Sequence, residues 1–423
     1  MRKLLFAAAS VSVLAACGGA GDGSEGNGSG GRASVNGGAT GASSVTIDVG
    51  DDFALRLQTA LIQASPGSTI TLPAGTFAMT DGLTLDVDGV TLRGASQSET
   101  ILDFKNQMGS GEGLLVTSDD VTLTNFTVRD SKGDGIKSKG ADRITYSNVT
   151  VEWLGEPSES NGAYGIYPVE STDVLVEGAH VRGASDAGIY VGQSNNIIVR
   201  DNLAEFNVAG IEIENSTNAL VNGNVVRNNA GGILVFDLPD LPVMGGNTTL
   251  IRNNLIQDNN TRNFAPPGNI VASVPSGTGV IVMANEKVMV RDNNFANNQT
   301  AHVLITAYSQ AFSDADYNPL PRNIEVRNNT YGESGYNPQG DLGELASMIG
   351  GNLPPIIWDG VTSWGGNDET DVNIFINEPE SVGFVNLGLG SYPIDVSAAS
   401  PSMDRPDGES IGNIPTVNLA HAE

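Results

Sequence analysis

Cysteine is almost absent from this 423-residue sequence, which contains a single one, Cys17. No disulfide can form within the chain, so its stability must come from a packed core. Basic residues are also scarce, because 21 Lys and Arg stand against 49 Asp and Glu, for a formal net charge of -28. Such an acidic surface repels a phosphate backbone, so we expect no nucleic-acid partner.

Aromatic residues make up only 6% of the chain and charged residues 17%, whereas glycine occurs 53 times. This composition is typical of a turn-dense all-β protein rather than of a helical one. The three histidines, His180, His302 and His421, are scattered and there is no second sulfur ligand. Neither a zinc site nor an iron site is therefore predicted.

Three near-copies of one unit follow one another between residues 174 and 236. They begin at Val174, Ile197 and Ala219, 23 and 22 residues apart, and each contains two short alternating apolar runs separated by Gly, Asn or Asp. Two strands per unit of this length describe one coil of a solenoid. Leucine-rich repeats share the period, but their leucine pattern and their helix per repeat are missing. The repeat predicts an all-β fold, a single-stranded right-handed parallel β-helix.

Alternation along the second run of each copy separates an inward row from an outward row, because successive side chains of a strand point to opposite faces. The predicted inward residues are Ile189, Val191, Ile211, Ile213, Ile233 and Val235. Asn202, Asn224 and Asn254 recur at one position of the turn. We expect them to form an internal ladder in which each amide donates to one neighbouring coil and accepts from the other.

The sequence divides into four segments. Residues 1–16 are predicted to be a signal peptide, and residues 17–44, rich in Gly, Ala, Ser and Asn, a flexible tether. Residues 45–335 contain the predicted β-helix. Residues 336–423 are expected to form a C-terminal cap and an extended tail, with a short helix at Leu342–Ile349 and a strand near Ile374–Ile376.

An apolar stripe at the start of the β-helix predicts a capping helix, with Asp51 and Asp52 as candidates for its N-terminal cap. The stripe consists of Phe53, Leu57, Leu61 and Ala64. Four longer segments interrupt the repeat and are expected to protrude as loops, namely residues 153–163, 237–248, 261–277 and 307–322.

The outward row of the second strands is the candidate binding strip. Its members fall one coil apart, roughly 4.8 Å, and they are Lys137 and Lys139, Tyr167, Tyr190, Glu212 and Glu214, Leu234 and Phe236, and Ile281 and Met283. Rings that stack on sugars and charged groups that orient hydroxyls or carboxylates suit a carbohydrate groove. The alternative is a solvated face with structural tyrosines. The apolar end of the row is either a protein contact surface or a face covered by the loops at 237–248 and 261–277.

Acidic residues lie beside this strip. Asp134 and Asp186 fall in turns, and with Glu212 and Glu214 they offer oxygen ligands for calcium, the one cofactor considered. No Asp-x-Asp-x-Asp loop supports a calcium site, so solvated turn carboxylates are the alternative.

Several stretches resemble the pectin-lyase-like superfamily of right-handed parallel β-helices, over roughly residues 48–335. They include PGSTITLPAGTF at Pro66, SDAGIYVGQS at Ser185 and VAGIEIENS at Val208. The chain is also similar to bacterial parallel β-helix repeat-containing (PbH1) proteins, a resemblance that implies the fold but no particular reaction.

The run Leu14-Ala15-Ala16-Cys17, which closes an apolar stretch too short to span a bilayer, resembles the lipobox of bacterial lipoproteins. This resemblance implies a lipid on Cys17 as the only membrane attachment, in the bacterial cell envelope; an ordinary signal peptide is the alternative. Gly18 stands where an Asp would signal inner-membrane retention, which favours the outer membrane.

The run from Tyr164 to Glu170 resembles the active-site strand Tyr-Gly-Phe-Asp-Pro-His-Glu of mannuronan C5-epimerases. Tyr164, Pro168 and Glu170 are retained, whereas Tyr167 and Val169 replace the catalytic Asp and His of the family. The resemblance therefore implies a binding strip at this place and argues against epimerase chemistry.

Three functions remain open from the sequence. Cleavage of an acidic polysaccharide by β-elimination would use Lys137 or Lys139 to neutralise the uronate, with Tyr167 or Tyr190 as base and acid. Hydrolysis would need a pair of carboxylates, such as Glu212 with Asp186 or Glu170. A non-catalytic lipoprotein would bind a glycan or an envelope protein instead. The candidate catalytic residues are Lys137, Tyr167, Tyr190 and Glu212, and the candidate binding residues are Tyr164, Glu170, Asp186, Glu214 and Phe236.

Overall fold

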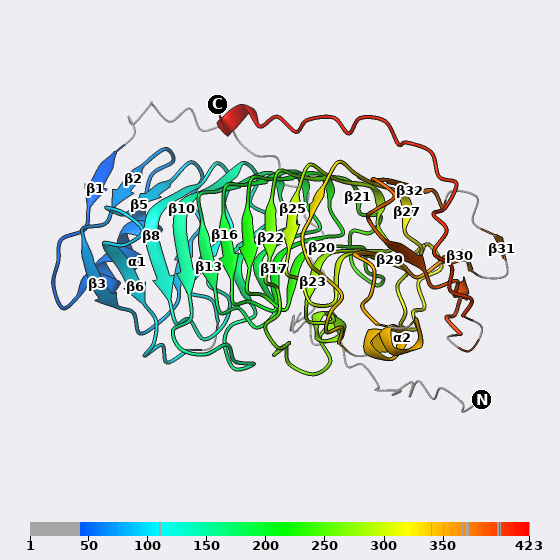
Figure 1. The fold of residues 1–423 in the computed structure, drawn as a ribbon. Coiled ribbons are helices and arrows are strands. Elements are labelled where there is room, and N and C mark those ends of the chain that lie inside the picture. Colours follow the sequence, from blue (N-terminus) through cyan, green and yellow to red (C-terminus); the bar gives the residue numbers. More distant parts are fainter. Residues whose placement is uncertain are drawn as a thin grey trace, which may run out of the picture.

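The computed structural model describes residues 43–109, 111–339, 341–349, 351–364, 367–368, 372–395, 397 and 399–422. Over these residues, short parallel strands stack along one axis into an elongated solenoid (Figure 1). Cys17 and the segments predicted to be a signal peptide and a tether lie outside the described residues, apart from the end of the tether at Ser43 and Ser44.

Helix α1 (Phe53–Gln63) covers the first coil, next to the edge strand β1 (Ser44–Thr46). The predicted apolar stripe faces the core, with Phe53, Leu57 and Leu61 buried and Ala64 partly buried. Asp52 is the residue before the helix, but its side chain makes no capping hydrogen bond. It pairs instead with Arg56, at 3.0 Å, so the predicted cap is wrong while the predicted helix is confirmed.

Each regular coil contains three strands, not the two that were predicted. In the coil that begins at Asn195 they are β15 (Asn195–Arg200), β16 (Leu203–Glu205) and β17 (Ala209–Glu214). The middle strand escaped prediction because three residues are too few to display an alternating pattern.

The first and second strands of the coils form one sheet, here called sheet A, and the third strands form sheet B. The first strands are β2 (Thr69–Thr71), β5 (Thr91–Arg93), β8 (Thr122–Arg129), β10 (Ile144–Glu152), β12 (Thr172–Glu177), β15, β18 (Thr217–Asn222), β21 (Asn247–Arg252), β24 (Glu286–Arg291), β27 (Arg322–Arg327) and β32 (Ile374–Asn377). The second strands are β3 (Gly75–Ala78), β6 (Thr100–Asp103), β13 (His180–Arg182), β16, β19 (Val225–Arg227), β22 (Leu255–Gln257), β25 (Asn294–Ala296) and β28 (Thr330–Tyr331); the long strands β8 and β10 extend through this position as well.

Sheet B is regular over its whole length, and every neighbouring pair within it is parallel. Its strands are β4 (Leu83–Leu85), β7 (Leu114–Val116), β9 (Ile136–Lys139), β11 (Tyr164–Val169), β14 (Ala187–Gly192), β17, β20 (Gly231–Phe236), β23 (Thr278–Met283), β26 (Ala301–Thr306), β29 (Ile356–Trp358) and β33 (Phe384–Asn386). Ile189 lies opposite Ile211, and Ile211 opposite Ile233, in one inward row. All six predicted inward residues are fully buried in the main core, which confirms the alternation.

Residues with a left-handed backbone conformation form corners of the coils. At one corner, Asp173, Asn196 and Asn218 have φ angles of 61°, 55° and 55°. Asn and Asp tolerate this conformation better than other residues with a Cβ atom. The recurrent Asn, Asp and Gly residues of the sequence therefore mark the places where each coil turns.

Two internal amide ladders connect the coils. In the predicted ladder, Nδ2 of Asn202 donates to Oδ1 of Asn224, and Nδ2 of Asn224 donates to Oδ1 of Asn254, both at 2.9 Å. This ladder is confirmed and continues through Asn293 and Asn329. A second ladder, which was not predicted, connects Asn207, Asn229, Asn259 and Asn298.

Three of the predicted loops fold over the outward face of sheet B, namely residues 237–248, 261–277 and 307–322; the second includes the short helix η1 (Ile270–Ser273). Val271, Val274 and Tyr317 from these loops belong to one buried cluster with the apolar end of the outward row, Leu234, Phe236, Ile281 and Met283. The apolar end of the row is therefore a covered face of the molecule.

The parallel coils continue past residue 335, the predicted end of the β-helix. Strand β29 pairs with β26, β33 pairs with β29, and β32 pairs with β27. Long insertions between these strands hide the repeat in the sequence. The predicted helix and strand of this region are confirmed as α2 (Asp341–Ile349) and β32, and a small separate sheet contains β30 (Val361–Trp364), β31 (Asn367–Asp368) and β34 (Gly390–Tyr392).

The C-terminal segment, red in Figure 1, runs back along the outside of the solenoid and ends in the short helix η3 (Ala420–Ala422). Its residues Ile414 and Leu419 pack on an outward apolar row of sheet A, which consists of Leu175, Ile198, Leu220, Leu250 and Met289. The hydroxyl of Ser410 and the backbone N–H of Ile411 both donate to Oε2 of Glu325, at 2.8 and 2.9 Å. The segment is thus fastened across several coils.

Candidate functional site

The outward row of sheet B contains the candidate site. The strand register places Lys137 opposite Tyr167 and Tyr190 opposite Glu212. Ile166 and Ile189 are paired, so Tyr167 and Tyr190 are neighbours as well. The four candidate catalytic residues therefore follow one another in the predicted order, on four successive coils.

This row changes from partly exposed to buried along its length. The side chain of Lys137 is 24% exposed, whereas Tyr190 and Glu212 are only 4% and 1% exposed. The loops over sheet B cover the row beyond that point. The predicted carbohydrate groove is thus open only over the first coils, and Phe236, predicted to bind the substrate, lies in the covered interior instead.

Three tyrosine rings meet where the open part of the row ends. The ring centroid of Tyr164 lies 4.5 Å from that of Tyr167 and 4.6 Å from that of Tyr190, and the last two are 4.9 Å apart. Tyr164 has this room because the residues opposite it on the next coils are small, Ala187 and then Ala209. The cluster combines apolar ring faces with hydroxyl groups, as sugar-binding surfaces do.

Two aspartates flank Tyr164. Its backbone N–H donates to Oδ1 of Asp134 at 3.2 Å, and its side chain is hydrogen-bonded to Asp186. Burial raises the pKa of Asp134 to about 6. Burial, reinforced by the charge of Glu214, raises the pKa of Asp186 to about 7. Carboxyl groups with pKa values near neutrality can exchange protons with a substrate, so this pair is suited to acid–base chemistry.

Two glutamates lie deeper under the loops. The hydroxyl of Tyr190 donates to Oε1 of Glu214 at 2.6 Å, and burial raises the pKa of Glu214 to about 7 even though this hydrogen bond lowers it. Both carboxyl oxygens of Glu212 are buried without a hydrogen-bond partner among the described residues. Burial, followed by the charges of Glu214 and Asp186, raises the pKa of Glu212 well above its usual value.

The two lysines of the row already have acidic partners. Nζ of Lys137 lies 3.4 Å from Oε1 of Glu112 and 3.9 Å from Oδ2 of Asp134, and it sits 4.8 Å from the centre of the Tyr167 ring. Nζ of Lys139 lies 3.4 Å from Oε1 of Glu170. Neither ammonium group is therefore free to neutralise the carboxylate of a uronate without losing these pairs.

The residues proposed as calcium ligands do not converge on a metal position. In the part of the chain that the structure describes, no group of three or more His, Cys, Asp or Glu side chains could hold a metal ion. Asp186, one of the four, instead accepts a hydrogen bond of 3.0 Å from Nδ2 of Asn269.

Sequence reasoning missed two contributors to this site. Glu112 is the nearer acidic partner of Lys137, and Asn269 reaches Asp186 from the loop at 261–277. Glu112 precedes β7, at the position that Asp134 occupies before β9, so a comparison of equivalent turns would have found it. Asn269 lies in a loop without periodicity, and nothing in the sequence indicates where such a loop folds.

The architecture corresponds to a known type of solenoid. Residues 88–240 match a family model described as "Right handed beta helix region". The chain is therefore a single-stranded right-handed parallel β-helix, which confirms the predicted fold class. No curated protein matches the chain in sequence. Among the described residues, no helix has the length and apolar character needed to cross a membrane.

Solved structures that resemble the chain include a mannuronan epimerase module and an alginate lyase. The A-module of mannuronan C-5 epimerase AlgE4 from Azotobacter vinelandii has 17% sequence identity and a TM-score of 0.50, over 79% of this chain and 95% of that chain. An alginate lyase from Paenibacillus sp. has 18% identity and a TM-score of 0.46, over 69% of this chain and 97% of that chain. At these identities the likeness shows the fold alone.

Proposed function

We propose that this protein binds a polysaccharide across the open part of the outward row of sheet B and hydrolyses it with Asp134 and Asp186. The observation that carries the proposal is the placement of these two carboxyl groups on either side of Tyr164, with pKa values raised to about 6 and about 7. The tyrosine rings beside them would stack on the sugar.

The pKa values of the two aspartates assign one of them as general acid and the other as general base. At neutral pH, Asp186 retains its proton for much of the time and acts as the general acid on the glycosidic oxygen. Asp134, with the lower pKa, is ionised and acts on the attacking water as the general base. Asp134 lies opposite Tyr164, and Tyr164 opposite Ala187, the residue after Asp186. Their backbones are thus two strand spacings apart, roughly 10 Å.

The paired lysines argue against β-elimination. That reaction must neutralise a uronate carboxylate before the neighbouring proton can be removed. Lys137 is already neutralised by Glu112 and Asp134, and the chain as a whole carries a formal net charge of -28, which repels a polyanion. A polysaccharide without carboxylate groups is the better substrate.

The test uses the full-length protein with a panel of neutral and acidic polysaccharides, and it follows new reducing ends and unsaturated uronate separately. We expect reducing ends without unsaturation on a neutral polymer, and a loss of about 100-fold or more in rate for Asp134→Asn and for Asp186→Asn. Asp201→Asn, an exposed aspartate at a corner of sheet A, is the matched control and should keep the wild-type rate. Unsaturated products, or hydrolysis that survives both substitutions, would overturn the assignment.

A non-catalytic binding protein is the second candidate. The closure of the row from Tyr190 onward favours it, because most of the face that could hold a polymer is covered by loops. If every polymer in the panel is unchanged while one of them is retained on the immobilised protein, binding without cleavage is the function.

We also propose that the chain is a lipoprotein of the bacterial cell envelope, attached to the membrane only through the lipid on Cys17. The support is the Leu-Ala-Ala-Cys run after a short apolar stretch. Metabolic labelling with a radioactive fatty acid should mark the wild type and leave Cys17→Ser unlabelled. Fractionation of the membranes then decides between the outer and the inner membrane.

A further inference from the structure

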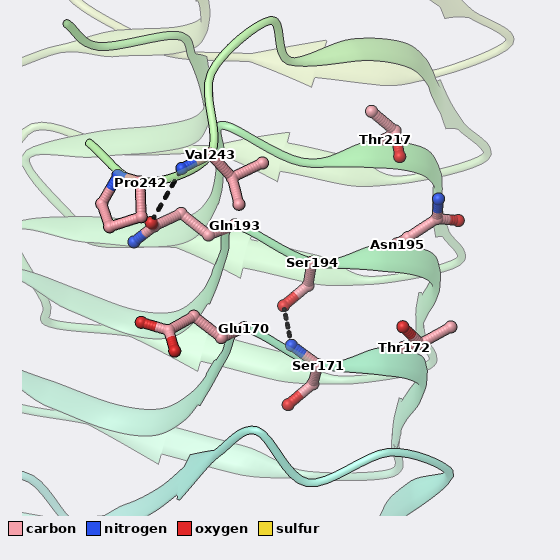
Figure 2. Close-up of a pocket in the computed structure, with 9 residues that line it drawn as sticks. All are labelled: Glu170, Ser171, Thr172, Gln193, Ser194, Asn195, Thr217, Pro242 and Val243. Atoms are coloured by element: carbon pink, nitrogen blue, oxygen red, sulfur yellow. Dashed lines mark hydrogen bonds between the residues drawn. The ribbon is translucent and has the colours of Figure 1, made fainter. Parts of the chain in front are cut away.

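A trough of about 420 Å³ lies at the corner where strands of sheet B turn into strands of sheet A (Figure 2). It is separate from Asp134 and Asp186, which do not line it. Its lining residues are Glu170, Ser171, Thr172, Gln193, Ser194, Asn195, Thr217, Pro242 and Val243. One of them, Glu170, was a candidate for substrate binding, and the others were not singled out by the sequence.

One side of the trough is a row of uncharged polar side chains. Thr172 lies opposite Asn195, and Asn195 opposite Thr217, at the beginnings of β12, β15 and β18. Thr172 and Asn195 are exposed and Thr217 is half-buried. Figure 2 draws no hydrogen bond between these three side chains and the other lining residues. The row repeats at the strand spacing, roughly 4.8 Å.

The opposite side is apolar and firmly held. Pro242 and Val243, from the loop at 237–248, form this wall. The backbone N–H of Val243 donates to Oε1 of Gln193 at 3.3 Å, and its carbonyl accepts from Nδ2 of Asn215 at 2.9 Å. Asn215 also accepts a hydrogen bond from the backbone of Leu238 at 2.8 Å. The wall is therefore preformed, although Val243 remains 42% exposed.

The floor is rigid because its hydroxyl groups are used within the protein. Oγ of Ser194 accepts from the backbone N–H of Ser171 at 3.1 Å and donates to the carbonyl of Gly192 at 2.7 Å. Oγ of Ser171 donates to the carbonyl of Val169. A ligand in the trough would thus meet fixed walls and little competition from mobile groups, which reduces the entropic cost of binding.

The chemistry of the lining selects an uncharged ligand. Glu170 is the only ionisable residue of the trough, and its carboxylate is 3.4 Å from Nζ of Lys139. A phosphate or uronate group would therefore find no free cation there. A sugar ring offers hydroxyl groups along its edge and C–H groups on its face, which match the polar row and the apolar wall.

We propose that this trough binds a neutral glycan, with successive sugar units lying along Thr172, Asn195 and Thr217 and against Pro242 and Val243. The side chains of Thr172, Asn195 and Thr217 repeat at a spacing comparable to the length of one sugar unit in an extended chain. The trough would hold a polymer beside the row of sheet B without taking part in cleavage, so this inference does not depend on the hydrolysis proposed above.

The experiment is isothermal titration of the full-length protein with cellohexaose, laminarihexaose, maltohexaose and mannohexaose, and with hexagalacturonate as the acidic probe. We expect saturable binding of at least one neutral hexasaccharide and weaker binding of hexagalacturonate. Asn195→Ala and Val243→Asp should each lower the affinity for the neutral hexasaccharide by about tenfold or more. Asn294→Ala removes an exposed amide from β25, outside the trough, and should bind as the wild type does.

Three outcomes would overturn the inference: no neutral hexasaccharide binds, hexagalacturonate binds more tightly, or binding survives both Asn195→Ala and Val243→Asp. Thermal melting of each variant excludes unfolding as the cause of a loss. Asp134→Asn separates the two proposals. If it abolishes cleavage and leaves the affinity unchanged, both stand; if it abolishes the affinity while Asn195→Ala does not, the ligand occupies the tyrosine cluster and the trough is not its site.

Discussion

The hydroxyl of Tyr190 donates a hydrogen bond of 2.6 Å to the carboxyl group of Glu214 on the next coil, and both side chains are buried. Tyr190→Phe would leave that carboxyl group without its donor and raise its pKa further. We expect the free energy of unfolding to fall by about 1–3 kcal/mol, measured by urea denaturation. Tyr336→Phe also removes a hydrogen bond of 2.6 Å, to Asn297, but at an exposed site, and should cost less than about 0.5 kcal/mol. Equal losses from both variants would contradict the importance of burial at Tyr190.

The buried carboxyl groups make stability depend on pH. Asp186 and Glu214 have pKa values raised to about 7, and Asp134 to about 6, by burial. Their pKa values in the unfolded chain are about 4. The folded state therefore binds these protons more tightly, and the resulting stabilisation is complete below pH ~4 and lost as the pH rises through ~7. Each group contributes a slope of up to about 1.4 kcal/mol per pH unit within that window.

Urea denaturation from pH 4 to pH 8 should therefore show a falling free energy of unfolding. His302 opposes this trend on the acidic side, because burial lowers its pKa to about 4 and its contribution is lost as the pH falls below ~6.5. Asp186→Asn should flatten the decline, while Asp201→Asn should leave it unchanged. A stability that rises steadily from pH 4 to pH 8 would refute this account.

Hydrolysis should have a narrow pH optimum. Asp134 must be ionised as the base, which requires a pH above about 6, and Asp186 must be protonated as the acid, which requires a pH below about 7. We expect kcat/KM to peak between these values and to decline on both sides. Activity that keeps rising to pH 9 would exclude Asp186 as the general acid.

The internal amide ladder predicts that removing one of its side-chain amides lowers the free energy of unfolding strongly. Asn224 accepts two hydrogen bonds from Asn202 and donates to Asn254 and to the carbonyl of Val199. Asn224→Ala leaves these buried groups without partners, so we expect a loss of about 3–5 kcal/mol in the free energy of unfolding. Asn294→Ala, which removes an exposed amide at the first residue of β25 where the backbone is extended, is the control and should change stability by less than about 0.5 kcal/mol. Similar losses at the two positions would show that the ladder adds nothing.

A single charged substitution should detach the C-terminal segment from the outward apolar row of sheet A. Ile414 is buried against the outward apolar row of sheet A, so Ile414→Asp would place a carboxylate in an apolar contact. We expect the unfolding free energy to fall by about 2 kcal/mol or more and a hydrophobic dye to bind the uncovered row. Asn413→Asp adds the same charge at an exposed neighbour and should do neither. Unchanged dye binding in Ile414→Asp would mean that the row stays covered by other residues.

More of the fold than of the candidate site could be predicted from the sequence. The inward row of Ile189, Ile211 and Ile233 and the ladder at Asn202 follow from period and spacing, and both are present. The alternation of side chains along the strand correctly placed Glu212 on the outward face. It could not show that loops would bury Glu212, because alternation tells which side of a strand a residue occupies and nothing about what covers that side. The hydrogen bond from Asn269 to Asp186 spans 83 positions of the chain and depends on the path of an irregular loop.

The packing of Ile414 and Leu419 in one cluster with Leu175, on a much earlier coil, also sets an order of events during folding. The segment can settle only on coils that are already stacked, because the outward row it contacts is contributed by five strands in turn. Long-range contacts of this kind form late in folding. A folding chain would therefore expose this apolar row to other proteins until the segment that contains Ile414 and Leu419 docks on it.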